Sequence, residues 1–204
     1  MADIESGLKD IAAIRGLMER SSRFLSLSGV SGIAAGVVAL LAAWSAHGIL
    51  GPAGEGGYEA GLDGVQSRNL ILLGFATLVA ALGLSWFFSR RMAARKGEAF
   101  WGPAGRHAAL ALGVPVAAGA AFTLLLLGNG QLWAVPGCTL VFYGLGLFSA
   151  GSFTFGEIRM LGLLELLLGF LALAFPGAGL LLWAAGFGVL HMAYGVYLYT
   201  KYER

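Results

Sequence analysis

The chain is 204 residues long, 58% of its residues are hydrophobic, only 12% are charged, and its formal net charge is +2. Soluble domains carry about 25% charged residues, and even a domain of about 150 residues buries only about 70% of its unfolded surface, so this composition excludes a soluble fold. A lipid bilayer is therefore the expected surroundings, and the basic residues do not indicate a nucleic-acid partner. Cys138 is the only cysteine, which excludes a disulfide framework and a cysteine-based metal site.

At the beginning of the chain, apolar residues recur at helical spacing and charged residues lie mostly on other faces. The apolar positions are Ile4, Leu8, Ile11, Ile14 or Leu17, and Met18. Residues 1–23 are predicted to form an amphipathic helix on the inner membrane surface, either an anchor that packs against the bundle or a docking site for a cytoplasmic partner. The segment lacks the continuous apolar core of a cleavable signal peptide.

The remainder, residues 24–204, is predicted to be one transmembrane domain. It contains six apolar segments, each near the roughly 20 residues that a helix needs to cross about 30 Å of hydrocarbon. These segments cover residues 25–48, 69–89, 107–127, 132–151, 158–176 and 179–200. Strands of a membrane β-barrel would instead alternate over about ten residues, so the pattern predicts an all-α protein with six transmembrane helices.

The basic residues predict the orientation. With six crossings, twelve of the thirteen Lys and Arg residues fall on one side: Lys9, Arg15, Arg20, Arg23, Arg90, Arg91, Arg95, Lys96, Arg106, Arg159, Lys201 and Arg204. The exception is Arg68, in the first outer loop beside three acidic residues. Because Lys and Arg are retained in cytoplasmic loops, both termini are predicted to be cytoplasmic, in a multi-pass protein of the cell membrane.

The spacing of the glycines indicates an internal repeat. The second, fourth and sixth spans each hold two glycines nine residues apart: Gly74 and Gly83, Gly137 and Gly146, Gly186 and Gly195. The first and fifth spans share a different correspondence, Gly29 with Gly36 and Gly162 with Gly169. These pairs predict three tandem helical hairpins related by an axis along the membrane normal, with the polar outer loop around residues 50–67 as an insertion in the first hairpin.

Glycines also matter for packing, because small residues let helices approach closely in lipid, where no hydrophobic force drives them together. The predicted packing positions are Gly29, Gly32, Gly36, Gly74, Gly83, Gly137, Gly146, Gly162, Gly169, Gly186, Gly188 and Gly195. We expect the faces that carry them to lie against protein, with Leu, Phe and Val facing lipid.

Two ionisable residues, Glu165 and His191, lie well inside predicted spans, where such groups are functional candidates by default. Each is thirteen residues from Ala178 in the tight turn between the last two spans, which places both about 20 Å below the turn. Three interpretations stay open: a structural polar pair, a proton-responsive or solute-binding pair, or a metal site. The metal site is the weakest of the three because two ligands are too few, so no metal ligand is predicted.

Motifs of common enzymes are not found. The sequence has no phosphate-binding glycine loop, no zinc-protease histidine pair and no Gly-x-Ser-x-Gly elbow, and His47, His107 and His191 are widely dispersed. We therefore disfavour an enzyme and expect no cofactor. Glu157 and Arg159, just before the fifth span, are interpreted as solvated charges at the level of the lipid headgroups, with a catalytic or gating role as the alternative.

The segment from Glu157 to Arg204, with its Gly-x-x-Glu, Phe-Pro-Gly and Tyr-Gly-Val-Tyr motifs, and the segment Met18 to Gly32 resemble a bacterial family of uncharacterised six-span membrane proteins. The glycine-rich hairpins more loosely resemble bacterial acid-resistance membrane proteins with six spans. The leading hypothesis is a non-enzymatic membrane module that self-assembles or binds a membrane partner, in an envelope or pH-stress role. The alternative is a small transporter or proton-coupled carrier that uses Glu165 and His191.

Overall fold

The computed structural model describes residues 28–51, 64–97 and 100–204, and the secondary structure of these ranges is helical throughout. The six helices are α2 (Gly29–Leu50), α4 (Gly64–Lys96), α5 (Pro103–Gly128), α6 (Val135–Ala150, preceded by η1, Leu132–Ala134), α7 (Glu157–Ala174) and a last helix formed by η2 (Pro176–Ala178), α8 (Gly179–Trp183), the π-helical η3 (Ala184–Leu190) and α9 (His191–Tyr202). The all-α prediction is confirmed. The predicted amphipathic helix over residues 1–23 lies outside the described residues.

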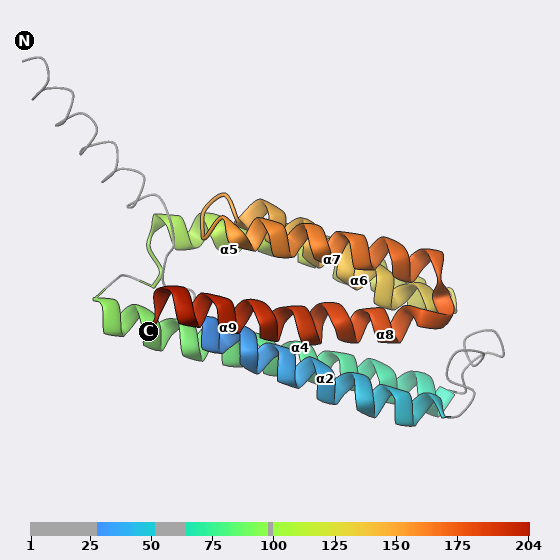
Figure 1. Ribbon diagram of the computed structural model, residues 1–204. Helices are drawn as coiled ribbons and strands as arrows, with labels where there is room; N and C mark the ends of the chain where they lie inside the picture. Colours follow the sequence, from blue (N-terminus) through green and yellow to red (C-terminus); the bar gives the residue numbers. More distant parts are fainter. Residues whose placement is uncertain (1–27, 52–63, 98–99) are drawn as a thin grey trace, which may run out of the picture.

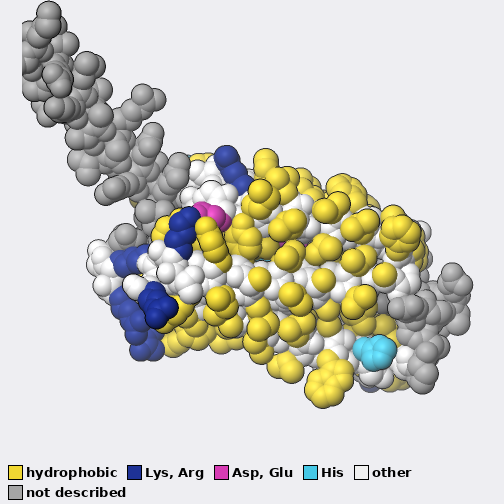
Figure 2. All heavy atoms as spheres, viewed as in Figure 1, with side chains coloured by type: hydrophobic (Ala, Val, Ile, Leu, Met, Phe, Trp, Pro, Cys, Tyr) yellow, Lys and Arg dark blue, Asp and Glu magenta, His cyan; other side chains and the backbone are white. Residues whose placement is uncertain are grey.

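Five of these helices are long and apolar enough to cross a membrane, which indicates a multi-pass membrane protein. They cover Gly29–Leu50, Gly64–Lys96, Pro103–Gly128, Leu132–Ala150 and Pro176–Tyr202. The helix of the predicted fifth span, α7, has 18 residues and carries three charged residues, Glu157, Arg159 and Glu165, so its composition does not place it among the five. Apolar side chains cover most of the face shown in Figure 2, as expected of a surface in contact with lipid.

The helices form two layers of three (Figure 1). One layer holds α5, α6 and α7, with α6 in contact with both neighbours, and the other holds α4, α2 and the last helix, with α2 in the middle. The turn at η2 connects the two layers. An apolar cluster of Leu147, Phe155, Ile158, Leu161 and Leu198 joins α6 and α7 to α9, so α7 and the last helix carry much of the contact between layers.

Within the first layer, α6 and α7 run antiparallel and touch through pairs of glycines. A Cβ built at Gly144 would lie 2.7 Å from the carbonyl oxygen of Gly162, and one at Gly137 would lie 2.9 Å from that of Gly169. Real Cβ atoms do not approach backbone so closely, so glycine is required at these positions for this helix spacing. Dispersion between the two backbones then stabilises the pair.

The second layer repeats this arrangement between α2 and the last helix. A Cβ at Gly36 would lie 2.7 Å from the carbonyl oxygen of Gly188, and one at Gly195 would lie 2.6 Å from that of Gly29. In both layers the paired glycines are seven residues apart, two helical turns, on each helix. These two close helix contacts are therefore built from the same pattern.

These contacts differ from the simple hairpin scheme. Successive helices α2 and α4, and α5 and α6, do lie side by side, but the glycine pairs join helices of different predicted hairpins. Of the three pairs spaced by nine residues, those in the fourth and sixth spans lie in close contacts, whereas Gly74 and Gly83 have no atom of the described residues within 4 Å of an added Cβ. Both glycines are exposed on α4, so the packing predicted at these two positions is not seen among the described residues.

The helix α4 extends beyond the predicted span 69–89 at both ends. At 1.5 Å per residue its 33 residues measure about 50 Å, well over the roughly 30 Å of a hydrocarbon core. Hydropathy locates only the apolar part, whereas Arg and Lys are good helix formers that continue the helix into the headgroup region.

Candidate functional site

Two buried ionisable residues meet between the two layers. Glu165, in the middle of α7, has no exposed surface, and His191, the first residue of α9, is 7% exposed. The Nδ1 atom of His191 lies 3.2 Å from Oε1 of Glu165. The structure therefore brings together the two ionisable residues that were expected at one depth of the bundle.

The π-helical segment η3 shapes the space for this contact. Nδ1 of His191 lies 3.0 Å from the carbonyl oxygen of Gly186, five residues earlier in the chain. Gly186 also makes room for the carboxylate, since a Cβ there would lie 2.5 Å from Oε2 of Glu165 and 2.6 Å from Cδ2 of Leu140. Gly186, predicted as a helix-packing residue, thus lies directly against the glutamate side chain. Short π-helical segments are often found at functional sites.

A third polar side chain completes the cluster. The hydroxyl group of Tyr143 in α6 lies 3.0 Å from Nε2 of His191, and the ring of Phe187 stacks near both side chains, with centroid distances of 5.0 Å to Tyr143 and 5.9 Å to His191. The sequence analysis missed Tyr143. A tyrosine in the middle of an apolar span was the available signal, because its hydroxyl group requires a polar partner when buried in a membrane protein.

The cluster has few donors for its carboxylate. Neither Oε1 nor Oε2 of Glu165 accepts a hydrogen bond of good geometry from the described residues, and the closest donor atom is Nδ1 of His191. Burial of a carboxylate without hydrogen-bond donors is costly, and the imidazole of His191 is the polar group placed beside it.

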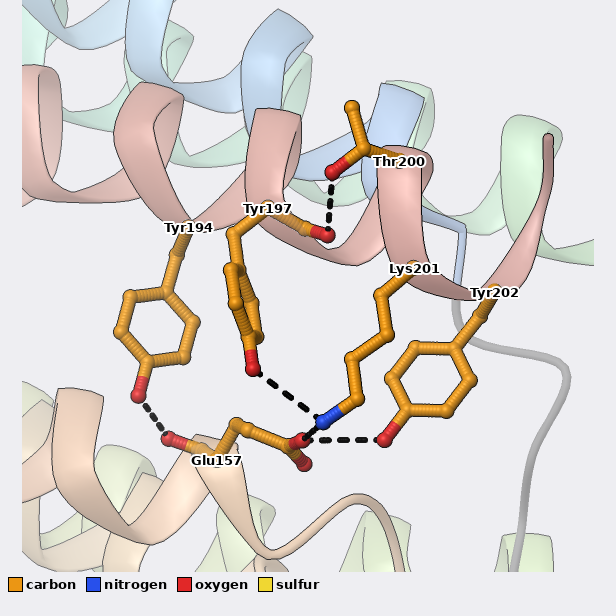
Figure 3. A network of polar contacts seen from close by, with 6 residues as sticks. All are labelled: Glu157, Tyr194, Tyr197, Thr200, Lys201 and Tyr202. Atoms are coloured by element: carbon orange, nitrogen blue, oxygen red, sulfur yellow. Dashed lines mark hydrogen bonds and ion pairs between the residues drawn. The ribbon is translucent and has the colours of Figure 1, made fainter.

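At the end of the bundle where the chain terminates, Glu157 is the centre of a second polar network (Figure 3). Its Oε1 accepts hydrogen bonds from Nζ of Lys201 (2.5 Å) and from the hydroxyl group of Tyr202 (2.9 Å). Tyr194 donates to its backbone carbonyl, and Lys201 also reaches the hydroxyl group of Tyr197 at 3.1 Å. These contacts fasten the first turn of α7 to α9.

This network contrasts with the simpler expectation of solvated headgroup-level charges. Burial alone would raise the pKa of Glu157, but hydrogen bonds from Lys201, from its own backbone and from Tyr202 outweigh burial, so the pKa is lowered from its ordinary value of 4.5. Arg159 donates to Oγ of Ser152 at 2.7 Å and is exposed. Glu157 is therefore a charged cross-helix partner, while Arg159 remains at the surface.

Another acidic residue joins the same end of the bundle to α2. The carboxylate of Glu203 accepts a hydrogen bond from the backbone N–H of Gly29, the first residue of α2, and one from Oγ of Ser28 at 3.3 Å. The first turn of α2 has no acidic residue of its own, so a carboxylate from the end of the chain satisfies its free N–H group.

Metal chemistry has little support here. In the ranges that the structure describes, no group of three or more His, Cys, Asp or Glu side chains is placed to hold a metal ion. Glu165 and His191 provide two ligands, His107 instead stacks on Phe153, and Cys138 is buried in a separate apolar cluster.

Comparisons of the chain with protein-family models, with curated proteins and with solved structures gave no match. The arguments for function consequently depend on the geometry of this chain. What that geometry offers is a closed polar cluster of Tyr143, His191 and Glu165 inside a multi-pass helical membrane protein.

Proposed function

We propose that this chain is a six-span protein of a bacterial inner membrane, with both termini in the cytoplasm, and that it acts as a non-enzymatic membrane module. In this proposal it assembles with itself or with a membrane partner, in an envelope or pH-stress role. Glu165 and His191 are then structural residues that hold the two layers together.

Crossing of the membrane by α7 is supported by its surroundings. It lies along α6 through Gly162 and Gly169, and its central charged residue, Glu165, is completely covered by protein. A buried acidic group adjacent to a histidine is compatible with a span, because lipid never meets the charge.

The orientation is supported by the placement of basic side chains. Among the described residues, Arg68 lies near the beginning of α4, and the other Lys and Arg residues belong to the opposite end of the bundle, where Figure 2 shows the dark blue side chains gathered. Such an end is typical of the cytoplasmic side.

The observation that carries a structural role is the complete burial of Glu165, with His191 almost as well covered. A transported solute or proton must be able to reach its site, whereas polar residues that only hold helices together are best shielded from water. Polar contacts between membrane helices contribute about 0.6 kcal/mol on average and up to about 2 kcal/mol. Besides this modest stabilisation, the cluster fixes the orientation in which the two layers pack.

A proton-coupled carrier is the second candidate, and one observation favours it. The carboxylate of Glu165 lacks hydrogen-bond donors of good geometry within the described residues, and Tyr143 and Glu165 lie 3.0 Å and 3.2 Å from the two ring nitrogens of His191. Such chains of ionisable residues mark proton paths in pumps and transporters.

The variants Glu165→Gln and His191→Ala separate the two candidates. Each is purified, its thermal stability in detergent is measured, and proton flux is recorded after reconstitution into liposomes. The structural role predicts lower stability in at least one variant and no flux in the parent protein. Flux in the parent that disappears in both variants, with stability unchanged, would establish the carrier instead.

Topology is tested separately with reporter fusions. Fusions in the loop between α4 and α5 and at both chain ends should report the cytoplasm, and fusions at η2 should report the outer side. A cytoplasmic signal at η2 would show that α7 does not cross the membrane.

A further inference from the structure

The far end of α4 combines basic and aromatic side chains at the depth of lipid headgroups. Arg90, Arg91 and Arg95 are exposed on its last turns, and Arg106 is exposed at the start of α5. Because α4 is about 20 Å longer than a hydrocarbon core is thick, these turns lie outside the hydrocarbon while the helix remains continuous.

The aromatic residue beside them has an interfacial geometry. Trp86 is 52% exposed, and the guanidinium group of Arg90 lies over its ring, 5.1 Å from the centroid. Tryptophan prefers the boundary between hydrocarbon and headgroups. Arg90 follows Trp86 by one helical turn, so this contact holds its guanidinium group further from the hydrocarbon than the tryptophan ring, at the level of the lipid phosphates.

The acidic residues that the structure describes at this end have other partners. Glu157 is bound to Lys201, and Glu203 is bound to the first turn of α2. In the sequence, residues 86–106 contain five basic residues and one acidic residue, Glu98. By composition, this segment therefore has an excess of positive charge.

Next to these arginines, α4 offers a long apolar surface. It has its main contact with α2, and the large side chains Leu78, Val79, Leu82 and Phe87 are about half exposed. Basic groups at the headgroup level above such a surface match both parts of a phospholipid, an anionic headgroup and its acyl chains.

We propose that the end of α4 is a binding site for an acidic phospholipid, with Arg90, Arg91 and Arg95 around the headgroup phosphate, Trp86 at the glycerol level and the acyl chains along the exposed apolar side of α4. Arginine suits this role because its planar guanidinium group forms paired hydrogen bonds to phosphate oxygens. The site rests on the membrane placement proposed above.

The test uses the full-length protein in nanodiscs of phosphatidylcholine containing a minor fraction of phosphatidylglycerol. Lipids retained after transfer to detergent are quantified by native mass spectrometry. We expect phosphatidylglycerol to be enriched severalfold over its bulk fraction in the wild-type protein. The triple variant Arg90→Gln, Arg91→Gln, Arg95→Gln should lose this enrichment, and single variants should lower it by up to about fivefold. The matched control is Arg68→Gln, which removes an exposed arginine from the opposite end of the same helix.

Two measurements on the wild-type protein keep the proposal falsifiable if the triple variant does not fold. Retention of the two lipids in proportion to their bulk fractions would overturn it, as would protection against heat by inorganic phosphate that equals the protection by phosphatidylglycerol. Loss of enrichment in Arg68→Gln to the same degree would also reject a site at this end. If the protein is extracted from membranes only by detergent yet shows no lipid preference, the lipid site fails while the membrane assignment stands.

Discussion

The contact between α6 and α7 can be tested by adding one methyl group at Gly162. A Cβ there would lie 2.7 Å from the carbonyl oxygen of Gly144 and 2.6 Å from the amide nitrogen of Phe148. Ordinary contact begins near 3.4 Å, so the two helices must separate by roughly 0.8 Å, and backbone cannot rotate away as a flexible side chain can. Overpacking of this kind costs about 1–3 kcal/mol, and the better helix propensity of alanine returns at most about 1 kcal/mol.

We therefore expect Gly162→Ala to lower the free energy of unfolding by about 1–2 kcal/mol. The single cysteine, Cys138, is buried in the described structure, so a dye that fluoresces after reaction with a thiol reports unfolding during a thermal ramp in detergent. The control is Gly74→Ala in α4, where an added Cβ meets no described atom within 4 Å, and it should leave stability unchanged or slightly higher. Equal shifts in the two variants would refute the close approach of α6 and α7.

Three further predictions concern the polar contacts. Gly186→Ala should destabilise the protein by about 1–3 kcal/mol, because its Cβ would meet the carboxylate of Glu165, and a double-mutant cycle with Glu165→Ala should show that the second change relieves part of this loss. Glu157→Gln should lower the melting temperature at neutral pH. Because folding lowers the pKa of Glu157, the contribution of this carboxylate to stability is present above pH 4.5 and disappears as the pH falls through the folded pKa. The difference in melting temperature between variant and parent should therefore vanish in acid, and a difference that persists there would contradict the network around Lys201. Glu203→Ala removes a cap from α2 and should cost about 1 kcal/mol, seen as faster hydrogen exchange in its first turn, and unchanged exchange would exclude the cap.

Several features could be predicted from composition and spacing because they depend on the solvent. Long apolar segments in a chain with few charges must become helices in lipid, where every backbone polar group needs an internal partner. The same reasoning located five of the six predicted spans as long apolar helices. The prediction of a span was weakest for α7, because this helix carries charged residues within its apolar sequence.

Glycine spacing was informative only in part. The pairs Gly29 with Gly36 and Gly162 with Gly169 were noticed as a correspondence, and both take part in close backbone contacts. Their partner glycines are also spaced by seven residues, whereas the nine-residue pattern included both close contacts, in the fourth and sixth spans, and the open positions Gly74 and Gly83. Frequent glycines produce several periods, and the sequence does not say which helix lies opposite.

The candidate site could likewise be predicted only in part. Equal distances from one tight turn placed Glu165 and His191 at one depth, because a helix rises by a constant amount per residue. The contribution of Tyr143, the room made by Gly186, the contact of Glu157 with Lys201 and the cap formed by Glu203 depend on segments distant in sequence.

By itself, then, the sequence determined the solvent of this protein, its helical class and the depth of its two buried ionisable residues, since these follow from local hydropathy and from the fixed rise of a helix. Only the tertiary structure decided which helices touch, because in lipid apolar faces are nearly equivalent and the choice of neighbour depends on the detailed fit of small residues and on a few polar contacts between distant segments.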